Sequence, residues 1–243
     1  MIRSRLTQEE RWYGSLLVFF TVSSLLPAVL WRLSGQQLAP IWLAEDGIYE
    51  SLAAVACLAA GLVFLYAFIA YPKKTDDVAG KANRNWLALV FAVLLILLFA
   101  EEISWGQRIF GLGTPEFISQ NSFQREINLH NLKILGRGNN TFSMSLFELM
   151  NIYLIVLPLA AYAFPSLRRV VQRLGFPIPS LQIALLATTI RLLNVASYRL
   201  VYGDSSARDV LHFGEVREST VELLLVVLAI EYLLKLRTRD ARR

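Results

Sequence analysis

Residues 86–111 read WLALVFAVLLILLFAEEISWGQRIFG, and this stretch decides what kind of protein the chain is. Its first part, residues 86–100, contains no charged side chain. A run of that length and composition is typical of a helix that crosses a lipid bilayer. Two adjacent glutamates, Glu101 and Glu102, then end the run, and further polar residues follow within two helical turns. The stretch indicates a membrane helix that ends in ionisable groups.

The composition of the 243-residue chain supports the same interpretation. The chain is 55% hydrophobic and 18% charged, whereas about a quarter of the residues of an ordinary soluble domain are charged. Crossing a hydrocarbon core of roughly 30 Å takes about 20 helical residues. Segments that meet this requirement lie near 13–33, 49–71, 86–106, 143–165, 181–202 and 215–236.

The sequence therefore predicts an all-α integral membrane protein, a bundle of about six transmembrane helices. Because no internal repeat is visible, residues 1–243 are interpreted as a single polytopic membrane domain. The first apolar run has no small-residue cleavage site after it, which favours an uncleaved helix over a signal peptide. One cysteine, Cys57, excludes an intrachain disulfide and a thiolate metal cluster.

The basic residues predict an orientation. Fifteen of the 24 lysines and arginines lie on the side of the predicted helices that also holds both termini. Such a bias marks the cytoplasmic face, and it gives the net charge of +5 a topological cause, so no nucleic-acid partner is predicted. Thirteen of the nineteen acidic residues and both histidines fall on the opposite, outer side. Acidic residues contribute little to topology, so their clustering needs another cause.

An amphipathic helical connection is predicted outside the membrane over residues 114–136. Thr114, Pro115 and Glu116 form a typical helix start, with Thr114 as N-cap, and Gly136 is a suitable stop. This connection is expected to lie on the outer membrane surface or to fold over the bundle. On it, His130 follows Glu126 by one turn. His130 is interpreted either as a surface histidine with an acidic neighbour or as part of a lid over the acidic residues.

The third predicted helix turns a polar face toward its end. At about 100° per residue, Glu101, Ser104, Trp105 and Arg108 share one arc. One interpretation is that Glu101 and Glu102 are interfacial residues paired with Arg108 and water. The other is that they face inward as functional groups. Two adjacent carboxyls favour the inward interpretation, because an ion pair needs only one.

The last predicted helix carries a longer polar stripe. His212, Glu215, Ser219 and Glu222 fall within an arc of about 80°. An extension of the helix into solvent explains the first two residues well. It explains Glu222 poorly, because this residue lies further into the apolar segment.

The fifth predicted helix supplies a positive charge. Arg191 lies near its middle and shares a face with Asn194 and Tyr198. A buried arginine is costly unless it meets a carboxylate or several carbonyls. A purely structural salt bridge and a role in substrate binding both remain open. The available acidic partners are Glu101, Glu102, Glu148 and Glu222.

The leading functional hypothesis is a hydrolase or transferase that acts on a lipid or lipid-linked substrate near the outer membrane face. Carboxylates and imidazoles suit general acid–base chemistry. A divalent metal would also fit two histidines and a carboxylate, with His130, His212 and Glu102 as candidate ligands, although no known zinc spacing is present. The predicted catalytic residues are Glu101, Glu102, His130, His212, Glu215 and Glu222. The predicted substrate-binding residues are Ser104, Arg108, Arg191, Asn194 and Tyr198.

The alternative is a non-enzymatic membrane subunit, or a small transporter or ion path, whose buried charges fix helix packing. Membrane lipid is the expected partner, with a second membrane subunit or another copy of the chain as further partners. The string EEISWGQRIFG…TPE followed by NLHN, within residues 99–131, resembles uncharacterised bacterial polytopic membrane proteins. That resemblance implies the bacterial inner (plasma) membrane and no particular reaction.

Overall fold

The structure is a computed structural model, which describes residues 8–34, 41–42, 47–71, 85–122, 127, 147–202 and 213–241. These ranges are helical and contain no β-strand, so the all-α prediction is confirmed. The long helices are α1 (Gln8–Ser34), α3 (Ile48–Ala70), α4 (Trp86–Glu102), α10 (Leu181–Tyr202) and α11 (Phe213–Ala241). The shorter elements are η1 (Ser104–Gly106), α5 (Gln107–Phe110), α6 (Glu116–Asn121), η3 (Ile152–Val156), α8 (Leu157–Ala163) and α9 (Pro165–Leu174).

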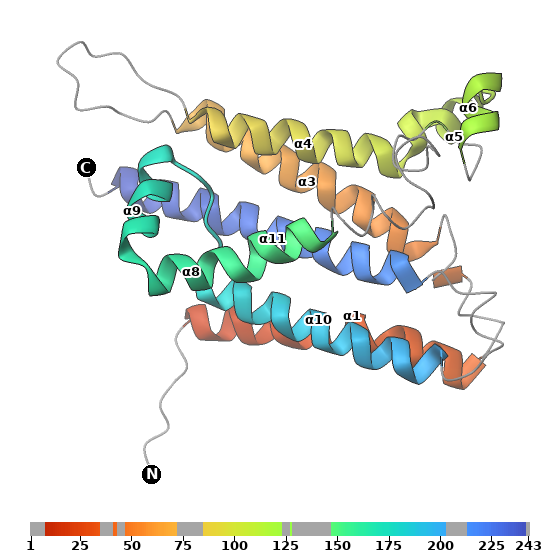
Figure 1. Cartoon of the computed structure of the whole chain (residues 1–243), viewed down its shortest axis with the longest axis horizontal. Helices are drawn as coiled ribbons and strands as arrows, with labels where there is room; N and C mark the ends of the chain where they lie inside the picture. The colour runs from red at the N-terminus through yellow and green to blue at the C-terminus, as the bar shows by residue number, and fades with distance from the viewer. Residues whose placement is uncertain are drawn as a thin grey trace.

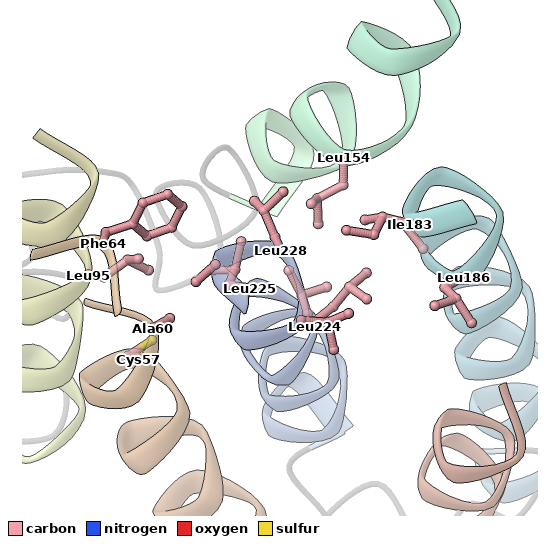
Figure 2. Close-up of a cluster of buried hydrophobic side chains, with 14 of the residues drawn as sticks. Cys57, Ala60, Phe64, Leu95, Leu154, Ile183, Leu186, Leu224, Leu225 and Leu228 are labelled. Atoms are coloured by element: carbon pink, nitrogen blue, oxygen red, sulfur yellow. The ribbon is translucent and has the colours of Figure 1, made fainter. Parts of the chain in front are cut away.

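Helix α11 lies in the middle of the bundle (Figure 1). The pair α3 and α4 packs on one side of it, and the pair α10 and α1 lies on the other. Large apolar side chains fill the space around α11, and Leu224, Leu225 and Leu228 reach toward both helix pairs (Figure 2). Phe64 of α3 and Ile183 of α10 face them from opposite sides. The hydrophobic core is therefore organised around α11.

Three helices are long and apolar enough to cross a membrane: Arg11–Ser34, Ile48–Ala70 and Leu181–Leu200. The other predicted spans differ for identifiable reasons. Helix α4 has 17 residues, which gives about 25 Å at 1.5 Å per residue, and Phe147–Ala163 is an apolar helix of the same shorter class. Helix α11 is long, but glutamates and a lysine interrupt its apolar length. Three candidate spans are thus shown, and the count of six stays a prediction.

Small residues let α3 and α4 approach closely. A Cβ atom built on Gly61 of α3 would lie 2.9 Å from Ile96 Cγ1 and 3.2 Å from the Ala92 carbonyl oxygen of α4. Ala92 and Ala60 are fully or almost fully buried nearby. Close backbone contact through small residues is the usual way in which helices associate in a bilayer, where apolar side chains gain little from leaving lipid.

A proline in α1 is matched by a tyrosine in α3. Pro27 lies inside α1 and has no N–H to donate to the carbonyl of Ser23, four residues earlier. The hydroxyl of Tyr49 donates to that carbonyl at 2.5 Å. In turn, the Tyr49 carbonyl accepts a hydrogen bond from Ser219 of α11 at 2.9 Å. Tyr49 therefore joins three helices while satisfying the group that Pro27 leaves open.

One end of the bundle, here called the α9 end, is closed by hydrogen bonds. Glu231 of α11 accepts hydrogen bonds from Tyr13 at 2.9 Å and from Ser180 at 2.6 Å, and it also pairs with Lys235. Lys235 lies four residues after Glu231 on the same helix, whereas Tyr13 and Ser180 come from other parts of the chain, so Glu231 connects α11 to both of them. Tyr153 closes the same end by donating to the Pro177 carbonyl at 2.5 Å.

Asn85 makes the second connection at the α9 end. Its side chain donates to the Gly175 carbonyl at 2.7 Å, contacts the Tyr232 hydroxyl, and accepts from Leu87 N at the start of α4. Gly175 has φ +73°, and a Cβ there would lie 2.9 Å from the Asn85 amide nitrogen. A glycine is required on both counts. The loop after α9 is thus fixed to α4 and α11.

Candidate functional site

The opposite end of the bundle, here called the glutamate end, begins where α4 stops. Ser104, Trp105 and Gly106 follow one another with φ values of 47°, 54° and 76°. Three successive left-handed residues cannot continue a right-handed helix, so α4 ends at Glu102. The predicted helix to residue 106 is therefore wrong, and Ser104 and Trp105 do not continue the helical face of Glu101 as predicted. For a residue other than glycine, this conformation costs of order 1–3 kcal/mol.

Gln107 holds the segment that follows the turn. Its amide nitrogen donates to Thr114 Oγ1 at 2.6 Å, and its amide oxygen accepts from Ile127 N at 2.8 Å. Because the Thr114 hydroxyl is engaged with Gln107, Pro115 occupies the N-cap position of α6 instead of Thr114. Helix α6 covers Glu116–Asn121, and most of the rest of the predicted helix 114–136 lies outside the described residues.

The glutamate end brings carboxyl groups together from three helices. The partly buried Glu102 of α4 lies within electrostatic reach of four other glutamates, and Glu222 has the strongest effect on it. Glu222 is 9% exposed. This glutamate cluster consists of Glu50 of α3, Glu101 and Glu102 of α4, and Glu218 and Glu222 of α11.

Cys57 joins the cluster from α3. Its side chain is fully buried, it forms a side-chain hydrogen bond with Glu222, and it lies within the electrostatic reach of Glu102. Since a thiol is the donor in a bond to a carboxylate, Cys57 gives Glu222 a partner on the side facing α3. The deepest part of the cluster is therefore formed by Cys57, Glu102 and Glu222.

Glu101 is directed toward the left-handed turn. Its Oε1 accepts a hydrogen bond from Trp105 Nε1 at 2.6 Å, and Trp105 is 45% exposed. The two adjacent glutamates thus have different surroundings, one at the rim beside an exposed indole and one facing Glu222. Ser104 lies between these two glutamates and Trp105 in the sequence. Its side chain is buried, with 1% exposed.

The polar stripe of the last helix is found in part. Ser219 bonds to Tyr49 and Glu222 bonds to Cys57, so both lie on the side of α11 that faces α3. Glu215 lies in the first turn of α11, but its side chain is outside the described part of the structure, and so is that of Arg108 in α5. His130 and His212 lie outside the described residues altogether.

The predicted substrate-binding residues of α10 lie apart from the cluster. Arg191 pairs with Glu148 at 3.1 Å, one of the four partners that the sequence offered. Asn194 is buried and donates to Thr220 Oγ1 of α11 at 2.9 Å. Tyr198 is 49% exposed. Arg191 is therefore not among the groups that act on Glu102.

The metal prediction stays open, because its two histidine candidates are not described. Within the described ranges, no three histidine, cysteine or acidic side chains are placed to hold one metal ion together. Glu102, the third predicted ligand, has carboxyl neighbours and a thiol in this part of the chain. Carboxyl groups gathered in this way suit proton transfer.

Several residues of the site were missed by the sequence prediction. Glu50, Cys57, Glu218 and Arg217 were not among the predicted site residues. Glu50 and Cys57 are seven residues apart, so they lie on one face of α3, and that spacing is visible in the sequence. The proximity of this face to Glu222 is set by the packing of α3 on α11, which no local pattern reports.

No family model, curated protein or solved structure matches this chain. What the protein does must therefore be inferred from the glutamate cluster and its surroundings.

Proposed function

We propose that the protein is a membrane-embedded hydrolase or transferase that acts on a lipid or lipid-linked substrate at the glutamate cluster. The observation that carries this proposal is that Glu102 of α4 and Glu222 of α11 lie within electrostatic reach of each other, near the buried thiol of Cys57. Ionisable groups within apolar helices are functional candidates by default. Here three helices each contribute at least one.

The chemistry proposed is general acid–base catalysis. It needs one group that gives a proton and another that takes it, and neighbouring carboxyls in different surroundings can divide these roles. Glu222 is buried against Cys57, while Glu101 lies at the exposed rim beside Trp105. Glu102, between them in the cluster, is proposed as the residue that exchanges the proton with substrate. His130, His212 and Glu215 are proposed as additional acid–base partners, or the histidines as metal ligands.

The proposed setting is a bundle of six crossings, in which α4, Phe147–Ala163 and α11 add to the three candidate spans. The glutamate end would face outward and both termini the cytoplasm, as the basic residues predict. In this arrangement the cluster opens to the outer leaflet, where lipid-linked substrates reach it laterally. Three of the inferred basic cytoplasmic residues, Arg168, Arg169 and Arg173, lie on α9, at the opposite end of the bundle.

The alternative function is a non-enzymatic subunit or ion path. It is favoured by the α9 end, where Glu231 and Lys235 only hold helices together. If the glutamate cluster has the same role, its residues matter for accumulation of the protein and not for turnover.

The test uses the full chain, purified and reconstituted into nanodiscs of bacterial lipid extract. The lipid classes are followed by mass spectrometry for wild type, Glu102→Gln and Glu222→Gln. The matched control is Glu116→Gln on α6, an exposed glutamate that bonds only within its own helix to Gln120. Wild type and the control should convert one lipid class, and the cluster variants should be slower by roughly 10²-fold or more. Equal conversion by all four proteins would refute the proposal.

A metal analysis of the same samples addresses the histidines. If a divalent metal co-purifies with wild type, His130→Ala and His212→Ala should each lower its content. Metal content that is unchanged in both variants would remove the histidines as ligands.

A further inference from the structure

We propose that Arg191 and Arg217 form a binding site for the phosphate group of the substrate, which makes that substrate a phosphorylated lipid. The reading of the ligand as a substrate rests on the proposed function. The site lies on the side of α11 that faces α10, opposite the side that carries Glu222 toward α3.

The two guanidinium groups meet at one aromatic ring. Arg217 Cζ lies 4.3 Å from the ring centroid of Phe147, and Arg191 Cζ lies 5.7 Å from it. Phe147 is 8% exposed and so is held in place. A cation over an aromatic face is attracted to it, more strongly when the pair is shielded from water. The ring thus contacts two positive charges that come from different helices.

Each of the two guanidinium groups has N–H donors that remain available to bind a ligand. A guanidinium has five N–H donors, and the observed acidic contacts are single ones, Arg191 to Glu148 at 3.1 Å and Arg217 to Glu218 at 3.5 Å. Arg217 Nε is buried and has no hydrogen-bond partner among the described residues. The side chains are 42% and 32% exposed, so a ligand can reach them.

The position of the pair selects an anion as its ligand. Arg191 lies within the candidate span Leu181–Leu200, where a guanidinium is costly unless it meets negative charge, and its single contact with Glu148 uses only part of its donors. Two planar forks that contact the same ring can together hold a tetrahedral oxyanion that accepts several hydrogen bonds, as phosphate does. A neutral lipid headgroup would leave those donors unsatisfied.

The pair is also connected to the glutamate cluster. Arg217 contacts Glu218, its neighbour in sequence, and Glu218 is one of the groups that act on Glu102. Glu218 therefore links the arginine pair on one side of α11 to the glutamate cluster on the other.

The binding test uses the full-length protein in a neutral detergent and native mass spectrometry. The probes are dioctanoyl phosphatidic acid, dioctanoylglycerol and inorganic phosphate, which separate a lipid phosphate from a free phosphate and from the acyl chains alone. The variants are Arg191→Gln, Arg217→Gln and Arg217→Lys. The control is Arg199→Gln, which removes an exposed arginine from the same helix α10.

Phosphatidic acid should bind wild type and Arg199→Gln equally, and each glutamine variant should bind it about tenfold more weakly. Arg217→Lys should fall between, because it keeps the charge and loses the fork. Dioctanoylglycerol should bind weakly to all proteins. Equal binding of phosphatidic acid to all variants, or equal binding of both lipids to wild type, would overturn the proposal. Strong binding of inorganic phosphate alone would restrict the ligand to a free phosphate and would also overturn it.

A purely structural role is separated by thermal unfolding without ligand. If Arg191→Gln or Arg217→Gln fails to fold, Arg217→Lys and Phe147→Leu are compared instead, and normal phosphatidic acid binding in both refutes the site. Failure of the proposed function has a different signature, because Glu102→Gln and Glu222→Gln would then keep wild-type turnover whatever the arginine variants bind.

Discussion

The two ends of the bundle use the same kinds of residue in opposite ways. At the α9 end, the carboxylate of Glu231 is surrounded by the donors Tyr13, Ser180 and Lys235. At the glutamate end, the charged neighbours of Glu102 are other carboxyls, and Glu222 has the largest effect among them. Donors around an acceptor stabilise a fold, whereas like charges brought together do not. The comparison separates a structural acidic residue from a candidate functional one.

The backbone shows the same contrast. The loop that leaves α9 turns at Gly175, a residue suited to positive φ. The chain that leaves α4 turns through Ser104 and Trp105, which adopt positive φ without that freedom. Strained backbone of this kind gathers at functional sites, where the surrounding structure enforces it. The following experiments change one end at a time and measure whether the contrast holds.

The largest expected effect is on stability at the α9 end. Glu231→Ala should lower the free energy of unfolding by about 2–4 kcal/mol, because it leaves the Tyr13 and Ser180 hydroxyls without their acceptor and Lys235 without its partner. Thermal and denaturant unfolding in detergent measure it. Glu116→Ala, on the exposed face of α6, is the control and should stay within about 0.5 kcal/mol. A Glu231→Ala variant as stable as this control would contradict the structural role.

The next effect concerns the link between α1 and α3. Tyr49→Phe should cost about 1–2 kcal/mol, since the Ser23 carbonyl then loses its donor in a buried place. In a Pro27→Ala background an N–H becomes available to that carbonyl, so the same tyrosine change should cost less. A double-mutant cycle measures the coupling. Identical costs in both backgrounds would show that Tyr49 does not serve the carbonyl freed by Pro27.

A smaller and more local effect is expected for Gln107→Ala. The variant loses the bonds to Thr114 and to Ile127 N, so amide exchange should speed up over residues 112–121 while overall unfolding changes by less than about 1 kcal/mol. Hydrogen exchange read by mass spectrometry provides the measurement. Gln120→Ala, which removes the contact with Glu116 within α6, should leave exchange in residues 112–115 unchanged. Unaltered exchange in the Gln107 variant would show that residues 112–121 keep their structure without the Gln107 side chain.

The smallest effect on stability is expected at the glutamate cluster. Glu102→Gln keeps the size of the side chain and removes a carboxyl that lies among other carboxyls, so the free energy of unfolding should stay level or rise by up to about 1 kcal/mol. The comparison is Glu231→Gln, which should be destabilising. Unfolding curves for the two variants in one detergent decide the matter. A loss above about 2 kcal/mol in Glu102→Gln would mean that this carboxyl has a structural role as well.

Much of the fold follows from hydrophobic patterning, and the parts that do not have local causes. Apolar runs located the long helices to within a few residues, as for Ile48–Ala70 and Leu181–Tyr202. The early end of α4 was missed because Ser104 and Trp105 have no preference for the left-handed conformation that they adopt. Helix α9 was missed as well, because its ten residues carry charges that suggested a loop.

The site was predictable where it depended on one helix, and not where it depended on two. Glu102 and Glu222 were identified because charges within apolar helices are conspicuous. Which charges meet is decided by helix packing, so Arg191 was offered four partners and the structure shows Glu148. Cys57 was assigned no functional role because a buried cysteine is ordinary in a core. Its contact with Glu222 exists only through the packing of α3 on α11.

The central position of α11 means that its angular setting controls both candidate sites together. Adjacent residues on a helix point about 100° apart. Arg217 therefore points toward Phe147 while Glu218, the next residue of the same helix, points toward the glutamate cluster. An axial rotation of that size, as an inserted residue would produce, would withdraw Glu222 from Cys57 and Arg217 from Phe147 in one movement. Any partner that twists α11 would therefore disable the two sites in concert.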